Sequence, residues 1–370
     1  MKGWRQYTMF AALLIIWGIF AWLTHGVFIS PRNLSNLFLQ TSAVGILAIG
    51  MSLVIITRNI DLSVGSGVAL TGAVAAYLQV NAHAGVGVSI AAALAAGLLI
   101  GLWQGFWIAY QGVPAFIVTL AGMMIFRGLV LGITQGATIA PLLSDFKAIG
   151  QGYIAPSFTM GIAVVVVAVS FVVFFSGRAK QIKFGFKVNP LAVDLTVRIG
   201  ILALVMAFFA VMIANRGLPY AVFLLFLLAL VFHFVATNTI FGRHLFALGG
   251  NPDAAALSGI NIKKRILVLF AVFGLLTGLA GVVMTARLNA ATTSAGQGME
   301  LDVIAACVIG GTSLLGGEGT IAGAVVGALI MASLDNGMSL MDTNITYQYI
   351  IKGMILLMAV WMDMQSRRGR

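Results

Sequence analysis

Long apolar runs recur along the chain, and they constrain the possible folds more than any other feature. Crossing a bilayer as a helix takes roughly 17–25 mostly apolar residues. The runs that meet this length are 8–29, 34–57, 62–80, 86–110, 113–133, 158–176, 199–214, 219–237, 266–286 and 347–363, with two more within 301–341. Because segments of this kind satisfy their own backbone in lipid only as helices, the sequence predicts an all-α polytopic membrane protein of about 10–12 transmembrane helices.

The composition excludes a soluble protein. Only 8% of the residues are charged, whereas a soluble domain carries about 25%. We therefore expect residues 1–370 to form a single transmembrane domain. The net charge of +11 has a use in membrane topology, so it indicates no nucleic-acid partner. The apolar run from Thr8 to Leu23 has no small-x-small cleavage site, which favours a retained first span over a signal peptide.

Basic residues are distributed unequally between the predicted loops. With the N-terminus inside, the inner loops carry fifteen of them: Lys2, Arg5, Arg58, Arg178, Lys180, Lys183, Lys187, Arg198, Arg243, Lys263, Lys264, Arg265, Arg367, Arg368 and Arg370. The outer loops carry four: Arg32, Lys147, Arg216 and Arg287. Cytoplasmic loops hold the positive excess, so we expect both termini and the loops 177–198 and 238–265 in the cytoplasm. The basic loop 177–198 either contacts anionic membrane lipid or a partner, or only sets the topology.

A short polar segment between two apolar runs has the pattern of a very short helix. Asn251 can cap its start, and Pro252 suits its first position. Asp253 favours the first turn, and Gly259 suits the residue just past the end. A helix from Pro252 to Ser258 would be roughly 10 Å long, which is too short to span a membrane. The pattern suggests a docking surface, and an ordinary capped cytoplasmic turn is the alternative.

Polar residues interrupt the apolar sequence at two further places. Asn59, Asp61 and Ser63 separate two apolar runs, either as a gate on a substrate path or as a tight turn in which Asp61 caps the next helix. Asp302, Thr312 and Ser313 flank or lie in a second, glycine-rich interruption and carry the same ambiguity. We expect the region 301–341 to form two short elements that meet near Gly316–Gly319, because a single pass would place the basic C-terminal tail outside.

The sequence contains no recognisable catalytic set. The Walker A pattern GxxxxGK[ST] does not occur, so the chain does not hydrolyse ATP by itself. The single cysteine, Cys307, and four scattered histidines give no metal site, and no Ser/His/Asp arrangement is evident. Arg127 and Lys352 fall within predicted spans, where we expect them to snorkel to the outer interface.

At this point the residues resemble a known family. The pattern Asp253-Ala254-Ala255-x-x-x-Gly259 resembles the EAA-x-x-x-G coupling loop of ABC-transporter permease subunits, with Asp in place of Glu. The sequence around it is similar to the ribose/xylose/arabinose/galactose permease group. NIDLSVGS at Asn59–Ser66 resembles the GGIDLSVGS signature of that group, with Arg58-Asn59 in place of Gly-Gly. Asp253 keeps the negative charge at the helix N-terminus, whereas Arg58 argues against a backbone conformation that needs glycine.

A third block, Arg287–Met341, is similar over its whole length, and the likeness runs from about residue 30 to residue 365. Within the group, ASLDNGMSLMD and QYIIKGMILLMAVWMD are most similar to bacterial xylose permeases. The resemblance implies an inner-membrane permease that works as two copies and imports a sugar, with D-xylose expected. A cytoplasmic ATP-binding subunit would bind the ATP and Mg²⁺, so this chain would hold no cofactor, and a sugar-loaded periplasmic binding protein would dock outside.

The resemblance also assigns roles to residues. It assigns ATPase coupling to Asn251, Pro252, Asp253, Ala254, Ala255, Leu257 and Gly259. A cation-coupled secondary sugar transporter is the alternative function. Such a transporter is expected to hold an ionisable residue deep within a span, whereas the candidates here lie at span ends.

Overall fold

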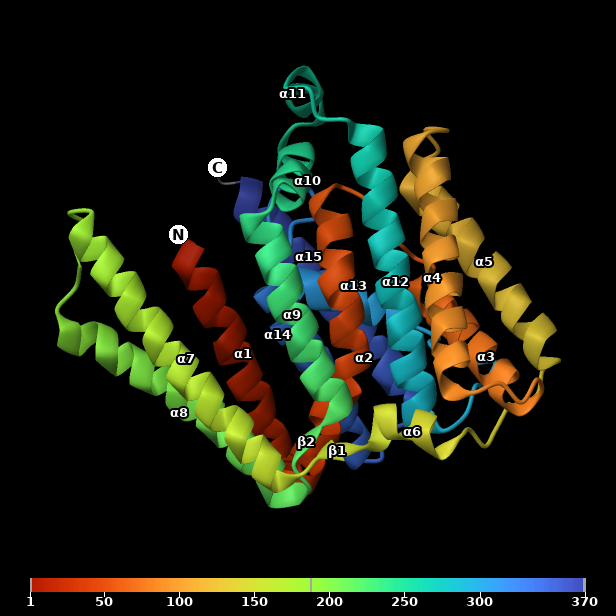
Figure 1. The fold of residues 1–370 in the computed structure, drawn as a ribbon, viewed down its shortest axis with the longest axis horizontal. Coiled ribbons are helices and arrows are strands. Elements are labelled where there is room, and N and C mark those ends of the chain that lie inside the picture. Colours follow the sequence, from red (N-terminus) through yellow and green to blue (C-terminus); the bar gives the residue numbers. More distant parts are fainter. Residues whose placement is uncertain (1, 187, 369–370) are drawn as a thin grey trace.

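The computed structural model describes residues 2–186 and 188–368, and its helices form one bundle (Figure 1). The helices are α1 (Lys2–Leu23), α2 (Pro31–Ile56), α3 (Val64–Val80), α4 (Val86–Ala109), α5 (Ala115–Thr134), α6 (Ser144–Gln151), α7 (Pro156–Lys183), α8 (Leu191–Asn215), α9 (Tyr220–Asn238), α10 (Ile240–Gly250), α11 (Pro252–Leu257), α12 (Ile262–Leu288), α13 (Met299–Ile309), α14 (Ile321–Leu340) and α15 (Ile345–Arg368). Two very short antiparallel strands, β1 (Tyr153–Ile154) and β2 (Leu218–Pro219), pair beside α6.

Nine helices within the described ranges are long and apolar enough to cross a membrane: α2, α4, α5, α7, α8, α9, α12, α14 and α15. The apolar part of α1, Met9–Leu23, and helix α3 are shorter. The prediction of an all-α polytopic membrane protein is confirmed. The region 301–341 contains two helical elements, as expected, although α13 has only 11 residues and α14 has 20.

Helices α2, α12 and α14 form the centre of the bundle. In the most apolar window of α2, 89% of the residues are buried, compared with 11% in α7. The Phe270 and Phe273 side chains of α12 are buried in this centre, where Phe273 lies against Gly50 of α2. A central helix that is apolar on every side is buried by its neighbours, whereas the exposed apolar surface of α7 is suited to lipid.

Helices α4 and α12 approach closely through small residues. A Cβ atom on Gly97 would overlap the Gly274 carbonyl oxygen, and one on Gly101 would overlap the Phe270 carbonyl oxygen. The close contact is reciprocal, because a Cβ on Gly274 would overlap the Gly97 carbonyl oxygen. Spaced glycines allow this approach between membrane helices, and the packing fixes α4 beside α12.

The segment 177–198 differs from its expected form, because most of it is helical. Helix α7 continues to Lys183, and α8 begins directly after Pro190, so only 184–190 lies outside the helices. Lysine, arginine and glutamine are good helix formers, so the helices extend past the apolar runs into the basic sequence. Arg178 and Asp194 form an ion pair near the tip of this hairpin. Lys187 lies outside the described residues.

Several elements reach the same end of the bundle (Figure 1). Helix α11, the C-terminal end of α15, the first turns of α1 and the tip of the α7–α8 hairpin all point in this direction. Helix α6 and the strands lie at the opposite end. The arrangement puts the basic segments of the sequence on one end. That this end is cytoplasmic stays a prediction from the charge distribution.

Candidate functional site

Helix α11 has the capped form that its sequence predicts. The Asn251 side-chain oxygen accepts a hydrogen bond from the Ala254 amide at 3.0 Å, and Pro252 is the first helical residue. After the helix, Gly259 adopts a φ of +80°, which favours glycine. These capping predictions are confirmed, and the helix ends at Leu257, one residue earlier than expected. Its role in docking stays a prediction.

The surface of α11 is short, shallow and exposed. Leu257 is 91% exposed at the last turn, and Asp253 and Ala254 are also exposed. Ala255 is buried beneath the helix. The Leu257 side chain is therefore an apolar surface at the end of a capped helix, and the described part of the chain leaves it almost fully exposed.

The preceding helix, α10, joins this surface to the bundle. A Cβ atom on Gly249 would overlap the Ile56 carbonyl oxygen at the end of α2. The same carbonyl oxygen accepts a hydrogen bond from the Gly317 amide at 2.9 Å. The end of α10, the end of α2 and the glycine-rich loop 310–320 therefore form one backbone junction directly below α11.

The break between α2 and α3 is organised by buried polar side chains. One Asp61 carboxylate oxygen accepts hydrogen bonds from both the Ser63 amide and the Ser63 hydroxyl, each at 2.7 Å. The Gln104 side-chain amide of α4 donates to the Ser63 hydroxyl oxygen at 2.5 Å. All three residues are buried. Asp61 thus forms a tight side-chain turn just before α3. The expectation that Asp61 caps this helix is wrong, because Ser63 occupies the N-cap position and no described side chain caps α3.

Gln104 was not among the residues predicted for this site. Its only signal is that of a lone polar residue within an apolar run, and the spacing gives no indication that it faces Ser63. Asn59 lies beside the turn and donates to the carbonyl and hydroxyl oxygens of Thr57 at 3.1 Å and 3.0 Å.

A second break, 289–298, meets the first one. A Cβ atom on Gly65, near the start of α3, would overlap the Gly296 carbonyl oxygen just before α13. With 17 and 11 residues, α3 and α13 measure about 25 Å and 16 Å, which is less than the roughly 30 Å of the hydrocarbon core. Interrupted helices that meet in this way form the substrate sites of many transporters.

Thr312 and Ser313 lie in the glycine-rich loop and are both buried. The Ser313 hydroxyl oxygen accepts a hydrogen bond from the Leu315 amide at 3.1 Å, and the Ser313 amide donates to the Glu318 carbonyl oxygen at 2.9 Å. The Thr312 hydroxyl has no hydrogen-bond partner in the described ranges. Ser313 therefore shapes the loop, and Thr312 offers an unused hydroxyl.

Asp302 is separated from this group by its pairing with Lys352. The Lys352 ammonium donates to the Asp302 carboxylate at 3.0 Å and lies 2.8 Å from the Asp335 carboxylate. The three residues connect α13, α14 and α15. The expectation that Lys352 snorkels to the interface is wrong, because its ammonium group forms ion pairs with Asp302 and Asp335 within the bundle. Sequence spacing could not indicate a pair 50 residues apart.

A family model described as "Branched-chain amino acid transport system / permease component" matches residues 33–360. The chain belongs to this permease family. The xylose transport system permease protein XylH of Escherichia coli K12 is 48% identical over 98% of this chain and 93% of its own length. XylH of Haemophilus influenzae is 46% identical over 98% and 97%. The ribose import permease protein RbsC of Escherichia coli K12 is 36% identical over 98% and 95%. No solved structure gives a significant match.

Arg127 of the permease also forms hydrogen bonds within the bundle. Its guanidinium donates to the carbonyl oxygens of Thr293 and Ala295, each at 2.9 Å. These carbonyls belong to the second break, so Arg127 fixes this break against α5 rather than snorkelling. In this way each of the two breaks is held by a side chain from a neighbouring helix, Gln104 in the first case and Arg127 in the second.

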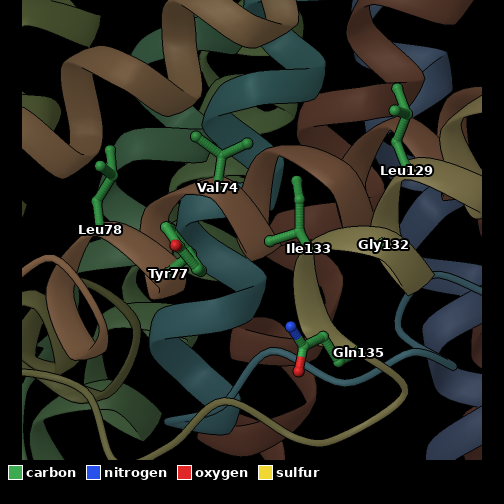
Figure 2. Close-up of a pocket in the computed structure, with 7 residues that line it drawn as sticks. All are labelled: Val74, Tyr77, Leu78, Leu129, Gly132, Ile133 and Gln135. Atoms are coloured by element: carbon green, nitrogen blue, oxygen red, sulfur yellow. The ribbon is translucent and has the colours of Figure 1, made fainter.

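An open groove of about 430 Å³ lies between α3 and α5 of the permease (Figure 2). Apolar side chains line most of it, and Tyr77 and Gln135 contribute the polar groups: Val74, Tyr77, Leu78, Leu129, Gly132, Ile133 and Gln135. None of the residues singled out from the sequence lines this groove. The interrupted helices and their buried hydroxyl and carboxylate groups are therefore the better candidate for a sugar path.

Proposed function

We propose that this chain is the membrane-spanning permease subunit of an ATP-driven, binding-protein-dependent D-xylose importer of the bacterial inner membrane. The family match and the XylH relatives support the permease role and the choice of D-xylose. The sequence has no Walker A pattern, so a separate ATP-binding subunit supplies ATP hydrolysis and holds the ATP and Mg²⁺. The family match gives no support to a cation-coupled carrier.

The exposed Leu257 on α11 is the observation that carries the coupling part of the proposal. With 91% exposure, its side chain has no cover from this chain. We assign Asn251, Pro252, Gly259 and the buried Ala255 to shaping and seating the helix, and the exposed Asp253, Ala254 and Leu257 to meeting the ATP-binding subunit. ATP binding moves α11, and α10 and α12 carry this motion into the bundle because they flank it directly in the chain.

The sugar path is assigned to the region around the two breaks and the glycine-rich loop 310–320. Asn59, Asp61, Ser63, Thr312 and Ser313 supply hydroxyl, amide and carboxylate groups there. A neutral sugar needs hydrogen-bonding partners of this type but no counter-charge. Asp302 is a weaker candidate for contact with the sugar, because one of its carboxylate oxygens is already paired with Lys352. Opening and closing of the breaks would alternate access from the two sides.

The remaining partners follow from the family resemblance. A second copy of this chain completes a homodimer, a sugar-loaded periplasmic binding protein docks at the end that holds α6, and lipid surrounds the exposed faces of α7 and α8. The loop 238–265 then lies in the cytoplasm with the coupling helix.

Substitution of Leu257 tests the docking assignment. Leu257→Asp places a charge in the proposed apolar contact, so we expect the variant to lose co-purification with the ATP-binding subunit and to lose ATP-driven uptake. Leu257→Met is expected to retain both. Val27→Asp is a matched control, because Val27 is also an exposed apolar residue, at 52%, but lies between α1 and α2 at the opposite end. Normal ATPase co-purification of Leu257→Asp would contradict the assignment.

Uptake of labelled sugars tests the substrate and the energy source. In a deletion background, the complete transporter is expected to take up D-xylose in preference to ribose, arabinose and galactose. Uptake should continue in the presence of an uncoupler as long as ATP is maintained. If the uncoupler abolishes uptake while ATP persists, the chain is a cation-coupled carrier.

A further inference from the structure

Arg58 lies where α2 ends and the first break begins. Its backbone has a φ of +64°, a left-handed conformation that residues other than glycine adopt at a cost in free energy. The sequence argued against such a conformation here, since arginine stands where the related signature has glycine. That expectation is wrong. The backbone keeps the conformation suited to glycine and gains a long cationic side chain.

The Arg58 guanidinium binds the end of α10. Its Nε donates to the Gly249 carbonyl oxygen and its Nη2 to the Gly250 carbonyl oxygen, each at 2.7 Å. The last carbonyls of a helix have no partner within the helix and carry partial negative charge. A planar guanidinium that donates to two of them fixes both distance and orientation.

The path of the side chain adds the glycine-rich loop to this contact. A Cβ atom on Gly316 would overlap Cγ of Arg58, so the side chain runs directly over Gly316 on its way to α10. Gly316 also has a φ of +81°. Arg58 therefore connects three parts of the junction: the end of α2, the glycine-rich loop and the end of α10.

We propose that Arg58 is a positioning residue that transmits movement of the coupling helix to the break between α2 and α3. The inference rests on the proposed function, because it needs α11 to be the element that the ATP-binding subunit moves. Asn251 ends α10 and caps α11, so the two helices are joined without a spacer. At the other side, Arg58 is three residues from Asp61, whose carboxylate forms the turn before α3.

Hydrogen bonds add something that packing at this junction does not supply. The packing of Gly249 against the end of α2 resists compression strongly, but its attraction is short-ranged and has little directionality. The two hydrogen bonds from Arg58 add a directional attraction, so the break follows α10 when α10 moves away as well as when it approaches. An alternating-access cycle needs both strokes, one to open the path and one to close it.

Transport per ATP hydrolysed tests this role in the reconstituted complex of permease, ATP-binding subunit and binding protein. Arg58→Gly keeps the left-handed backbone and removes the guanidinium, and Arg58→Lys keeps the charge with a single-point donor. His83→Gly is the matched control, because His83 is an exposed residue of the loop between α3 and α4 with a φ of +52°. It releases the same backbone strain without touching the junction.

We expect the complex with Arg58→Gly to assemble and hydrolyse ATP. The amount of D-xylose transported per ATP should fall by a factor of roughly five or more. Arg58→Lys is expected to be intermediate, and His83→Gly to match the wild type. An unchanged ratio in Arg58→Gly would overturn the inference. Loss of the ATP-binding subunit from Arg58→Gly would also overturn it, because Arg58 would then only hold the docking surface. The wild-type arm alone reports on the proposed function: if the unaltered chain does not bind the ATP-binding subunit, that function fails first.

Discussion

Asp61 illustrates how one side chain can satisfy two interpretations of the sequence. Its carboxylate accepts two hydrogen bonds from Ser63, which is the tight turn that the structural interpretation expects. The same turn places Ser63 in contact with Gln104 at the meeting point of the two breaks, which is where a gate is expected. Transport can depend on the negative charge of Asp61 or on the turn that it forms, and the two are separable by substitution.

Two substitutions at this position separate the charge from the turn. Asp61→Asn keeps the acceptor oxygen, so we expect nearly wild-type thermal stability and D-xylose uptake. Asp61→Ala removes it and leaves the buried Ser63 amide unpaired, which should lower the free energy of unfolding by about 1–3 kcal/mol. Thermal unfolding in detergent and uptake in vesicles measure the two effects. A strong uptake defect in Asp61→Asn at unchanged stability would show that the charge itself acts on the path.

Local and non-local interactions differ in how well the sequence predicted them. The Asn251 cap and the left-handed Gly259 depend on neighbours within a few positions, so residue type and spacing were enough. Gln104 binds Ser63, 41 residues away, and Lys352 binds Asp302, 50 residues away. These contacts depend on how the helices pack, which residue type and spacing in one sequence do not predict. For the same reason the two lone charges, Arg127 and Lys352, looked like snorkelling residues.

At the scale of elements, the glycines of α4 decide how near α12 can lie. Gly101→Leu would drive a side chain into the Phe270 carbonyl of α12. We expect a loss of about 1–3 kcal/mol or more in stability, as overpacking produces, and a marked fall in folded protein recovered from membranes. Gly87→Ala is the control on the same helix, because no atom lies within 4 Å of a Cβ built there. Normal recovery of Gly101→Leu by fluorescence-detected size exclusion would contradict the close α4–α12 packing.

The lengths of several helices differ from the lengths of the apolar runs that predicted them. The runs 158–176 and 199–214 correspond to α7 and α8, but both helices continue well beyond them into basic sequence. In contrast, the apolar region 301–341 holds the 11-residue α13, because Gly310 and Gly311 follow it and the glycine-rich loop begins. Apolar length measures the hydrocarbon crossing, whereas helix length also depends on propensity and on where glycine or proline interrupts the chain.

For the whole molecule, the side of the membrane that α11 faces can be measured by cysteine labelling. The one native cysteine, Cys307, is buried, so the unaltered chain gives a low background with a membrane-impermeant maleimide. We expect Leu257→Cys to be labelled only after the cytoplasmic face is opened, and Val27→Cys to be labelled in intact spheroplasts. The reverse pattern would overturn the orientation derived from the fifteen inner and four outer basic residues.

The left-handed backbone at Arg58 also bears on how such a contact can arise in evolution. A single-base change converts a glycine codon into an arginine codon. In a chain whose backbone already holds the glycine conformation, that change adds a side chain without redesigning the fold. The Arg58 contact with α10 is thus one base change away from a chain with glycine at position 58, and it needs no change in the surrounding backbone.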